Sequence, residues 1–141
     1  MDFKVNSSDL LKAISHIHGV VEIRHTLPIL SNMIITAKDG WLKLCSTNLD
    51  IYCSDQVNAE VLLPGEISVS ASTFHEIIKR LPNGSDLHAT LDEESSSLIL
   101  KCGRSKFNLT TMKTDDFPTI ADTDLDINFV LSATELIRMI D

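Results

Sequence analysis

Few residues in this sequence have the types and spacing that catalysis requires. His75-Glu76 lacks the second histidine that completes a zinc-protease motif on a helix. Asp115 and Asp116 form a carboxylate pair, but adjacent residues in a polar segment usually point to solvent. The chain has no serine in a G-x-S-x-G context and no glycine-rich phosphate loop. We therefore predict a scaffold or binding protein without catalytic residues, not an enzyme.

The thiol and imidazole side chains show no pattern typical of a metal site. The three cysteines are widely spaced without a C-x-x-C pair, and the five histidines lack zinc spacing. We expect the cysteines to be small, reduced core residues, and we expect no metal and no cofactor. The residues concerned are Cys45, Cys53, Cys102, His16, His18, His25, His75 and His88.

The remaining candidates are cations that could bind phosphate, and their distribution matters because the net charge is −8. Taken alone, that charge argues against nucleic acid, whose backbone is also negative. Two predicted helical windows hold Lys12, Lys79 and Arg80 against two acids, Asp9 and Glu76, and so carry +1. The rest of the chain then carries −9. If both helices face one way, the molecule has a mildly basic face and an acidic back. The alternative is that both are ordinary solvated helix faces.

A pattern that occurs three times would position these cations. The copies start at residues 3, 67 and 129, so that they are offset by 64 and 62 residues. Each copy opens with alternating apolar residues, which is typical of a strand, and continues with a helix-capping residue and an amphipathic helix. The predicted caps are Asn6, Ser70 and Ser132.

Between the copies, short apolar alternations are separated by turn signals such as Lys38-Asp39-Gly40. We assign two βαβββ units in a pseudo-two-fold arrangement to residues 1–125 and the start of a second domain to residues 126–141. The predicted class is α+β, with two helices side by side on one face of antiparallel sheets. The end at Asp141, soon after the third helix begins, is expected to be a truncation.

Length and composition agree with one ordinary domain that has its own core. The chain has 141 residues, of which 43% are apolar. No apolar run approaches the length of a membrane span, and the N-terminus lacks the features of a signal peptide. We expect a cytoplasmic protein with no membrane partner.

Two motifs are fairly specific when they occur together. They are Arg24 followed by Thr26-Leu27-Pro28-Ile29-Leu30, and Gly103-Arg104-Ser105-x-Phe107. On these motifs the chain resembles the bacterial sliding clamp family, the beta subunit of DNA polymerase III, over its whole length. Further matches are Leu10-Leu11-Lys12, Asp39-Gly40, Thr47-Asn48-Leu49-Asp50, Leu81-Pro82-x-Gly84 and Asp116-Phe117-Pro118.

The resemblance implies a DNA polymerase processivity factor in DNA replication. Clamps of this family are head-to-tail homodimeric rings with three similar domains per chain, and their helices line a channel that encloses duplex DNA. The ring tethers the replicative polymerase and is placed on DNA by a clamp loader. This chain then looks like a first domain with the opening of a second. The family's pocket for polymerase peptides lies between later domains and should be missing.

The resemblance also implies DNA-binding residues. Arg24 corresponds to a DNA-contacting arginine at the channel, and Lys12, Lys79 and Arg80 are candidates from their helix positions. The family often has a basic pair at the start of the second helix. This chain has Ser72-Thr73 there, which weakens the contact expected at that point.

A subunit interface is implied at an apolar strand edge. Phe107 and Leu109 match the edge that meets the third domain of the other subunit, and Arg104 and Lys106 would flank it as charge partners. Without that domain the chain should not close a ring. We expect it to be a monomer or a weak dimer.

Two alternatives predict different structures. An acidic α+β protein-interaction module without a DNA role would show no clustering of positive charge on the helices. A small hydrolase would show a deep pocket with converging polar groups.

Overall fold

The computed structural model describes residues 1–21, 27–118 and 129–140. Strands and helices follow one another in the order that the repeat predicts, with one additional short strand at residues 60–63 and without the strand of the third copy. The elements are β1 (Asp2–Asn6), α1 (Ser7–His18), a 3-10 turn η1 (Pro28–Ser31), β2 (Asn32–Lys38), β3 (Trp41–Thr47), β4 (Tyr52–Asn58), β5 (Glu60–Leu63), β6 (Gly65–Ser70), α2 (Ala71–Lys79), β7 (Asp86–Asp92), β8 (Ser97–Cys102), β9 (Ser105–Met112) and α3 (Ala133–Ile140).

The first two helices begin where their capping residues predict. The Oδ1 atom of Asn6 accepts hydrogen bonds from the backbone N–H groups of Ser8 and Asp9, at 3.0 and 3.4 Å. The Oγ atom of Ser70 accepts from the N–H of Thr73 at 3.4 Å. These bonds satisfy N–H groups that have no partner within a helix, so they fix where each helix starts.

The sheet is built by an exchange of strands between the two repeats. Its order is β4-β3-β2-β6-β9-β8-β7-β1-β5, and all the pairs are antiparallel. The strand before each helix pairs with the first strand after the other helix: β1 with β7, and β6 with β2. The two units are thus related as a pseudo-two-fold pair, as predicted, and neither unit completes its sheet without the other.

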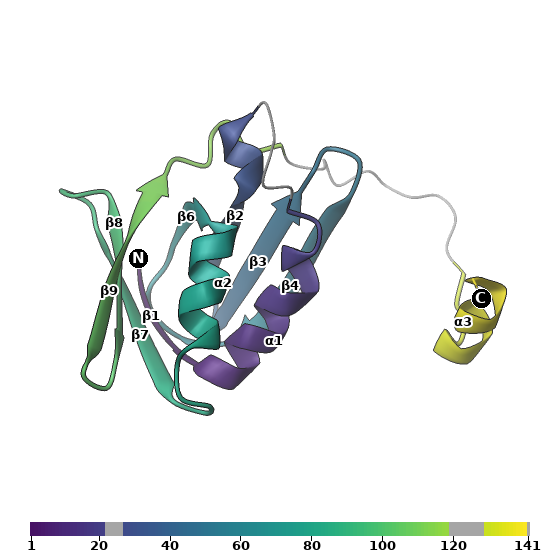
Figure 1. The fold of residues 1–141 in the computed structure, drawn as a ribbon, viewed down its shortest axis with the longest axis horizontal. Coiled ribbons are helices and arrows are strands. Elements are labelled where there is room, and N and C mark those ends of the chain that lie inside the picture. Colours follow the sequence, from purple (N-terminus) through teal and green to yellow (C-terminus); the bar gives the residue numbers. More distant parts are fainter. Residues whose placement is uncertain (22–26, 119–128, 141) are drawn as a thin grey trace.

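Both helices lie side by side on one face of the sheets and run in opposite directions (Figure 1). From α1, Leu10, Ile14 and Ile17 are fully buried, and from α2, Phe74 and Ile78 are. These positions lie on one stripe of each helix because side chains three or four residues apart share a face. The stripes fill the space above the inner face of the sheets and form one continuous core.

Two sequence motifs with no obvious role pack against each other in a smaller second core. Ile29 and Leu30 of η1 are buried with Phe117, which lies far along the chain in the Asp116-Phe117-Pro118 motif. Ile34 and Cys45 complete this core, and burial raises the pKa of the Cys45 thiol. The motifs therefore have structural roles, and Cys45 is a small core residue, as predicted.

The segment between β3 and β5 differs from the prediction. Apolar residues alternate from Ile51 to Val61, as is typical of one strand, but the chain forms β4 and β5, with the break at Ala59. Ile51 is 52% exposed. The cause is a tight turn in which Thr47 Oγ1 donates to the carbonyl of Ile51 at 2.8 Å, which holds Ile51 outside the sheet.

The third copy of the repeat forms its helix but not its strand. Ser132 caps α3, since its Oγ accepts from the N–H of Glu135 at 3.3 Å and donates to that carboxylate at 2.7 Å. Residues 129–132 form no strand, and Phe129 and Val130 are exposed. The predicted strand is absent because no described strand lies beside it to supply hydrogen bonds. No helix in the described part of the chain is long and apolar enough to cross a bilayer.

Replacement of the first cap tests how much the start of α1 stabilises the fold. Asn6→Ala removes both capping bonds and the bond from Asn6 Nδ2 to the carbonyl of Gly84. We expect the free energy of unfolding to fall by about 1–2 kcal/mol in urea denaturation. Asn108→Ala, on the exposed face of β9, is the matched control and should change it by less than about 0.5 kcal/mol. Equal losses in both variants would mean that the cap adds nothing specific.

Candidate nucleic-acid interface

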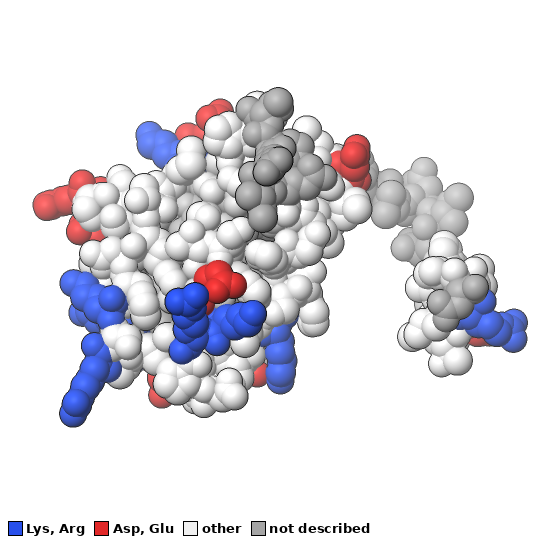
Figure 2. Space-filling model, viewed as in Figure 1, with Lys and Arg blue, Asp and Glu red and all other residues white. Residues whose placement is uncertain are grey.

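The outer sides of α1 and α2 face away from the core and form one surface. This surface carries the three cations that were predicted on the helices. Lys12, Lys79 and Arg80 are all exposed. Their direction follows from packing, because burial of the apolar stripes turns the polar positions of both helices toward solvent. Figure 2 shows Lys and Arg side chains gathered over the end of α2, the neighbouring part of α1 and the adjacent edge of the sheet, with most acids toward the margin.

Two of these cations form ion pairs with a carboxylate on the same helix. Lys12 Nζ lies 3.8 Å from Asp9, and Arg80 Nη2 lies 3.5 Å from Glu76. Both pairs are exposed, so water and salt screen them and the cations can exchange partners. Lys79 has no ion pair among the described residues. It is therefore the cation most available to an incoming phosphate. Arg24 lies outside the described residues.

Histidines also lie on and beside this face. His18 of α1 and His75 of α2 stack across the seam between the helices, with ring centroids 4.5 Å apart and planes inclined by 26°. Burial, and next the nearby His18, lower the pKa of His75. His16 Nδ1 lies 2.6 Å from Asp55 on β4, and this hydrogen bond lowers the pKa of Asp55.

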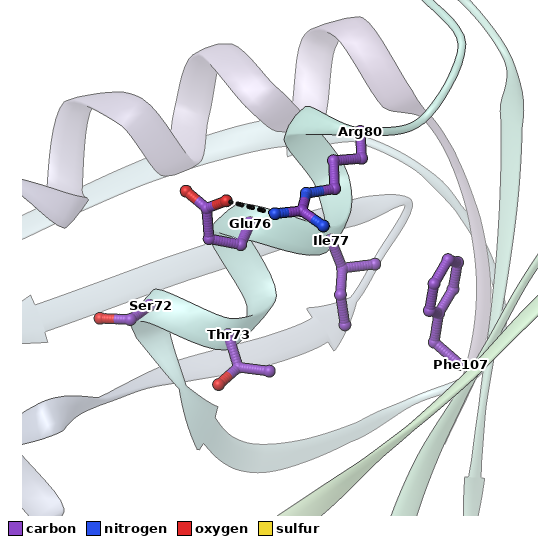
Figure 3. Close-up of a pocket in the computed structure, with 6 residues that line it drawn as sticks. All are labelled: Ser72, Thr73, Glu76, Ile77, Arg80 and Phe107. Atoms are coloured by element: carbon purple, nitrogen blue, oxygen red, sulfur yellow. Dashed lines mark ion pairs between the residues drawn. The ribbon is translucent and has the colours of Figure 1, made fainter.

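A second surface lies where α2 meets β9. A groove of about 390 Å³ runs between them, and Figure 3 shows Ile77 of α2 on the same side as the ring of Phe107, with the Glu76–Arg80 ion pair on the neighbouring turn of the helix. Residues 105–110 of β9 pair with β8 on one side only, because β6 reaches just Thr111 and Met112. The groove is therefore bounded by a partly unpaired strand edge. Its lining residues are Ser72, Thr73, Glu76, Ile77, Arg80 and Phe107.

The two apolar residues that were expected at this edge differ in exposure. Leu109 is only 4% exposed and belongs to the main core, whereas Phe107 is half-buried and borders the groove. Both side chains point to the same face of β9, since they are two residues apart, but Leu109 lies deeper under the helices. Arg104, in the β8–β9 turn, and Lys106 are exposed. Lys106 is paired with Lys101 and alternates with Phe107 along β9, so it lies on the other face of the strand.

The sequence prediction missed Ile77 as a partner of Phe107. The signal was present in the spacing of Thr73, Ile77 and Arg80, which places them along one side of α2. Among the described residues, no group of histidine, cysteine and acidic side chains could hold a metal ion.

Comparison with known proteins agrees with this architecture. Residues 1–121 match the family model of the DNA polymerase III beta subunit, N-terminal domain. The chain belongs to this family. It is 36% identical to the beta sliding clamp of Caulobacter vibrioides over 141 residues and 37% identical to that of Pseudomonas aeruginosa over 142 residues. Each alignment covers 100% of this chain but 38% of the relative, so the chain spans well under half the length of these clamps.

Solved structures of clamps have the same fold. The Caulobacter crescentus pol III beta structure superposes with a TM-score of 0.94 at 36% identity, covering 99% of this chain and 38% of that one. The DNA polymerase III subunit beta from Pseudomonas aeruginosa gives a TM-score of 0.93, also at 36% identity, covering 99% of this chain and 38% of that one. The clamp fold predicted from the sequence is confirmed, and neither an unrelated interaction module nor a small hydrolase is favoured.

The His16–Asp55 bond predicts a pH-dependent contribution to stability. Because the pKa of Asp55 is lowered on folding, its contribution is present above its ordinary pKa of about 4 and is lost as the pH falls through the folded value. We expect Asp55→Asn to lower the free energy of unfolding at neutral pH by less than about 1 kcal/mol, since the pair is partly exposed. The deficit should largely disappear near pH 2, about two units below the ordinary pKa.

Urea denaturation at both pH values measures this difference. Asp50→Asn, in the β3–β4 turn, removes the same charge from a carboxylate that has no ion pair among the described residues. This control should show little deficit at either pH. A deficit in Asp55→Asn that is equally large in acid would mean that the ionised carboxylate is not its cause.

Proposed function

We propose that this chain is the first domain of a sliding clamp that encircles duplex DNA and tethers the replicative polymerase. The observation that carries the proposal is the single exposed face formed by α1 and α2, on which Lys12, Lys79 and Arg80 gather while most acids lie elsewhere. The named clamps that share the fold support it. In the assembled ring this face would line the channel, and its role is processivity without chemistry.

The net charge of the chain explains why such a domain would enclose DNA instead of binding it tightly. The net charge of −8 repels the phosphate backbone, and among the described residues the helix face offers three lysine or arginine cations, two of which have carboxylate partners. Weak phosphate contacts position a protein without reading sequence. Retention would come from topological closure, and weak contacts leave the ring free to slide.

The groove between α2 and β9 is proposed as the subunit interface of a head-to-tail homodimer. It combines an apolar floor at Ile77 and Phe107 with an unpaired strand edge, which favours pairing with another chain. Arg104 and Lys106 would meet acids of the third domain of the other subunit. Ser72 and Thr73 line the same groove, so this part of α2 would face the interface more than the channel.

The domain organisation and setting follow from the same proposal. Residues 1–125 form the first clamp domain, and residues 126–141 begin the second, to which α3 would contribute. The exposed apolar side chains Leu136, Ile137 and Ile140 of α3 would be buried in that domain. The polymerase and the clamp loader would bind the full-length ring, in the cytoplasm.

Removal of one channel cation from the full-length protein tests the DNA contact. Lys79→Ala should weaken binding to duplex DNA and lower the slope of log K against log salt concentration by about one unit for each phosphate that the variant no longer neutralises. Arg24→Ala should act in the same way and change stability by no more than about 0.5 kcal/mol. The measurement is fluorescence anisotropy across a salt series.

Lys101→Ala is the matched control, because Lys101 is exposed on β8 on the face turned away from the helices. It removes the same charge and should leave the slope unchanged. Should Lys101→Ala lower the slope as much as Lys79→Ala does, the helix face would not be the DNA-binding surface.

Removal of the aromatic side chain at the groove tests the interface. Central interface aromatics typically contribute about 2 kcal/mol or more, so Phe107→Ala in the full-length protein should raise the dimer dissociation constant by about 30-fold or more. Asn108→Ala, on the opposite face of the same strand, should leave it unchanged. Sedimentation equilibrium gives both constants. A dimer of wild-type strength in Phe107→Ala would move the interface away from this groove.

A further inference from the structure

The stacked imidazoles of His18 and His75 occupy a particular place on the helix face. Each is half-buried and follows a fully or almost fully buried neighbour, Ile17 or Phe74, so the rings close the outer side of the seam between α1 and α2. The pair is therefore accessible from the surface that is proposed to face DNA. The spacing of these histidines in the sequence does not indicate a metal site, and the proposed clamp function gives them no role.

The charges around the pair favour the binding of an anion. On α2, Lys79 opposes protonation of His75 and Glu76 favours it. Glu76 is itself paired with Arg80, and no carboxylate of the described residues forms an ion pair with either ring. From α1 and β4, His16 and Asp55 pair with each other.

In the free protein, this arrangement makes it unfavourable for both imidazole rings to be protonated at the same time. Two imidazolium rings 4.5 Å apart repel each other, and partial burial of His75 adds a cost for its charge. An anion at the seam reverses both effects, because it screens the repulsion and accepts hydrogen bonds from the charged rings. Histidine changes charge between about pH 5 and 8, so the protonation equilibrium lies within reach of such a ligand.

We propose that His18 and His75 form a proton-linked phosphate-binding site, with the backbone phosphate of duplex DNA as its ligand and Lys79 as its permanent cation. This inference rests on the proposed function. Binding of a phosphate draws a proton onto the pair, and the proton comes from solvent. The contact between the domain and DNA therefore strengthens as the pH falls. His16 takes no part, because the carboxylate of Asp55 neutralises its charge when it is protonated.

Imidazole NMR of the 141-residue chain tests the site directly. The pKa values of all the histidines are measured at low salt, without DNA and with an excess of a short duplex of arbitrary sequence. The expected result is a higher pKa for His18 or His75 with DNA, and no change for His88. His88 is the internal control because its Nε2 lies 2.7 Å from Asp2, on the face of β7 turned away from the helices.

Binding of the full-length protein to the same duplex then tests the consequence. A rise of one unit in one imidazole pKa corresponds to about tenfold tighter binding at low than at high pH. The double variant His18→Gln with His75→Gln should lose this pH dependence between about pH 5 and 8, whereas His88→Gln should retain it. The NMR spectra also report whether each variant is folded.

The outcomes separate this inference from the proposed function. If the wild-type protein binds DNA without pH dependence, or if the double variant keeps the wild-type dependence, the phosphate site is wrong and the clamp proposal stands. If the full-length protein binds no duplex at either pH, both are wrong.

Discussion

The burial of one stripe of α1 and one stripe of α2 against the same sheets is the constraint on which the rest of the molecule depends. Leu10, Ile14 and Phe74 are completely removed from solvent, which is the largest favourable contribution available to a domain of this size. Because a helix buries only one side, this packing also decides which residues face outward. Lys12 and Lys79 therefore lie on one surface because the core forms, and no direct interaction between them is needed to place them there.

The same packing explains why two functional surfaces meet at α2. The outer side of this helix contributes Lys79 to the basic face, and its flank contributes Ile77 to the groove beside Phe107. Arg80 borders both surfaces and pairs with Glu76 at their junction. A short helix of nine residues therefore serves one surface suited to phosphate and another suited to protein.

Local features were predictable from the sequence, and long-range features were not. The caps at Asn6 and Ser70 and the turn at Asp39-Gly40, where both residues have positive φ as a tight hairpin requires, depend on neighbours within a few residues. The strand exchange and the place of β5 depend on contacts between distant segments. The exposure of Ile51 depends on one turn that overrides the apolar pattern. Alternation also could not separate Leu109 from Phe107, because it gives the face of a strand and not the depth beneath the helices.

The exchange of β1 and β6 between the two units affects how the chain folds while it is being synthesised. β1 is made first, but its partners β5 and β7 end at Leu63 and Asp92. At about 5–20 residues per second, β1 waits roughly 4 to 17 s before its second neighbour has been synthesised. During that interval Phe3 and Val5, which end in the core, lack the neighbouring strand β7. The nascent chain thus exposes an apolar segment that is suited to binding by a chaperone at the ribosomal exit tunnel.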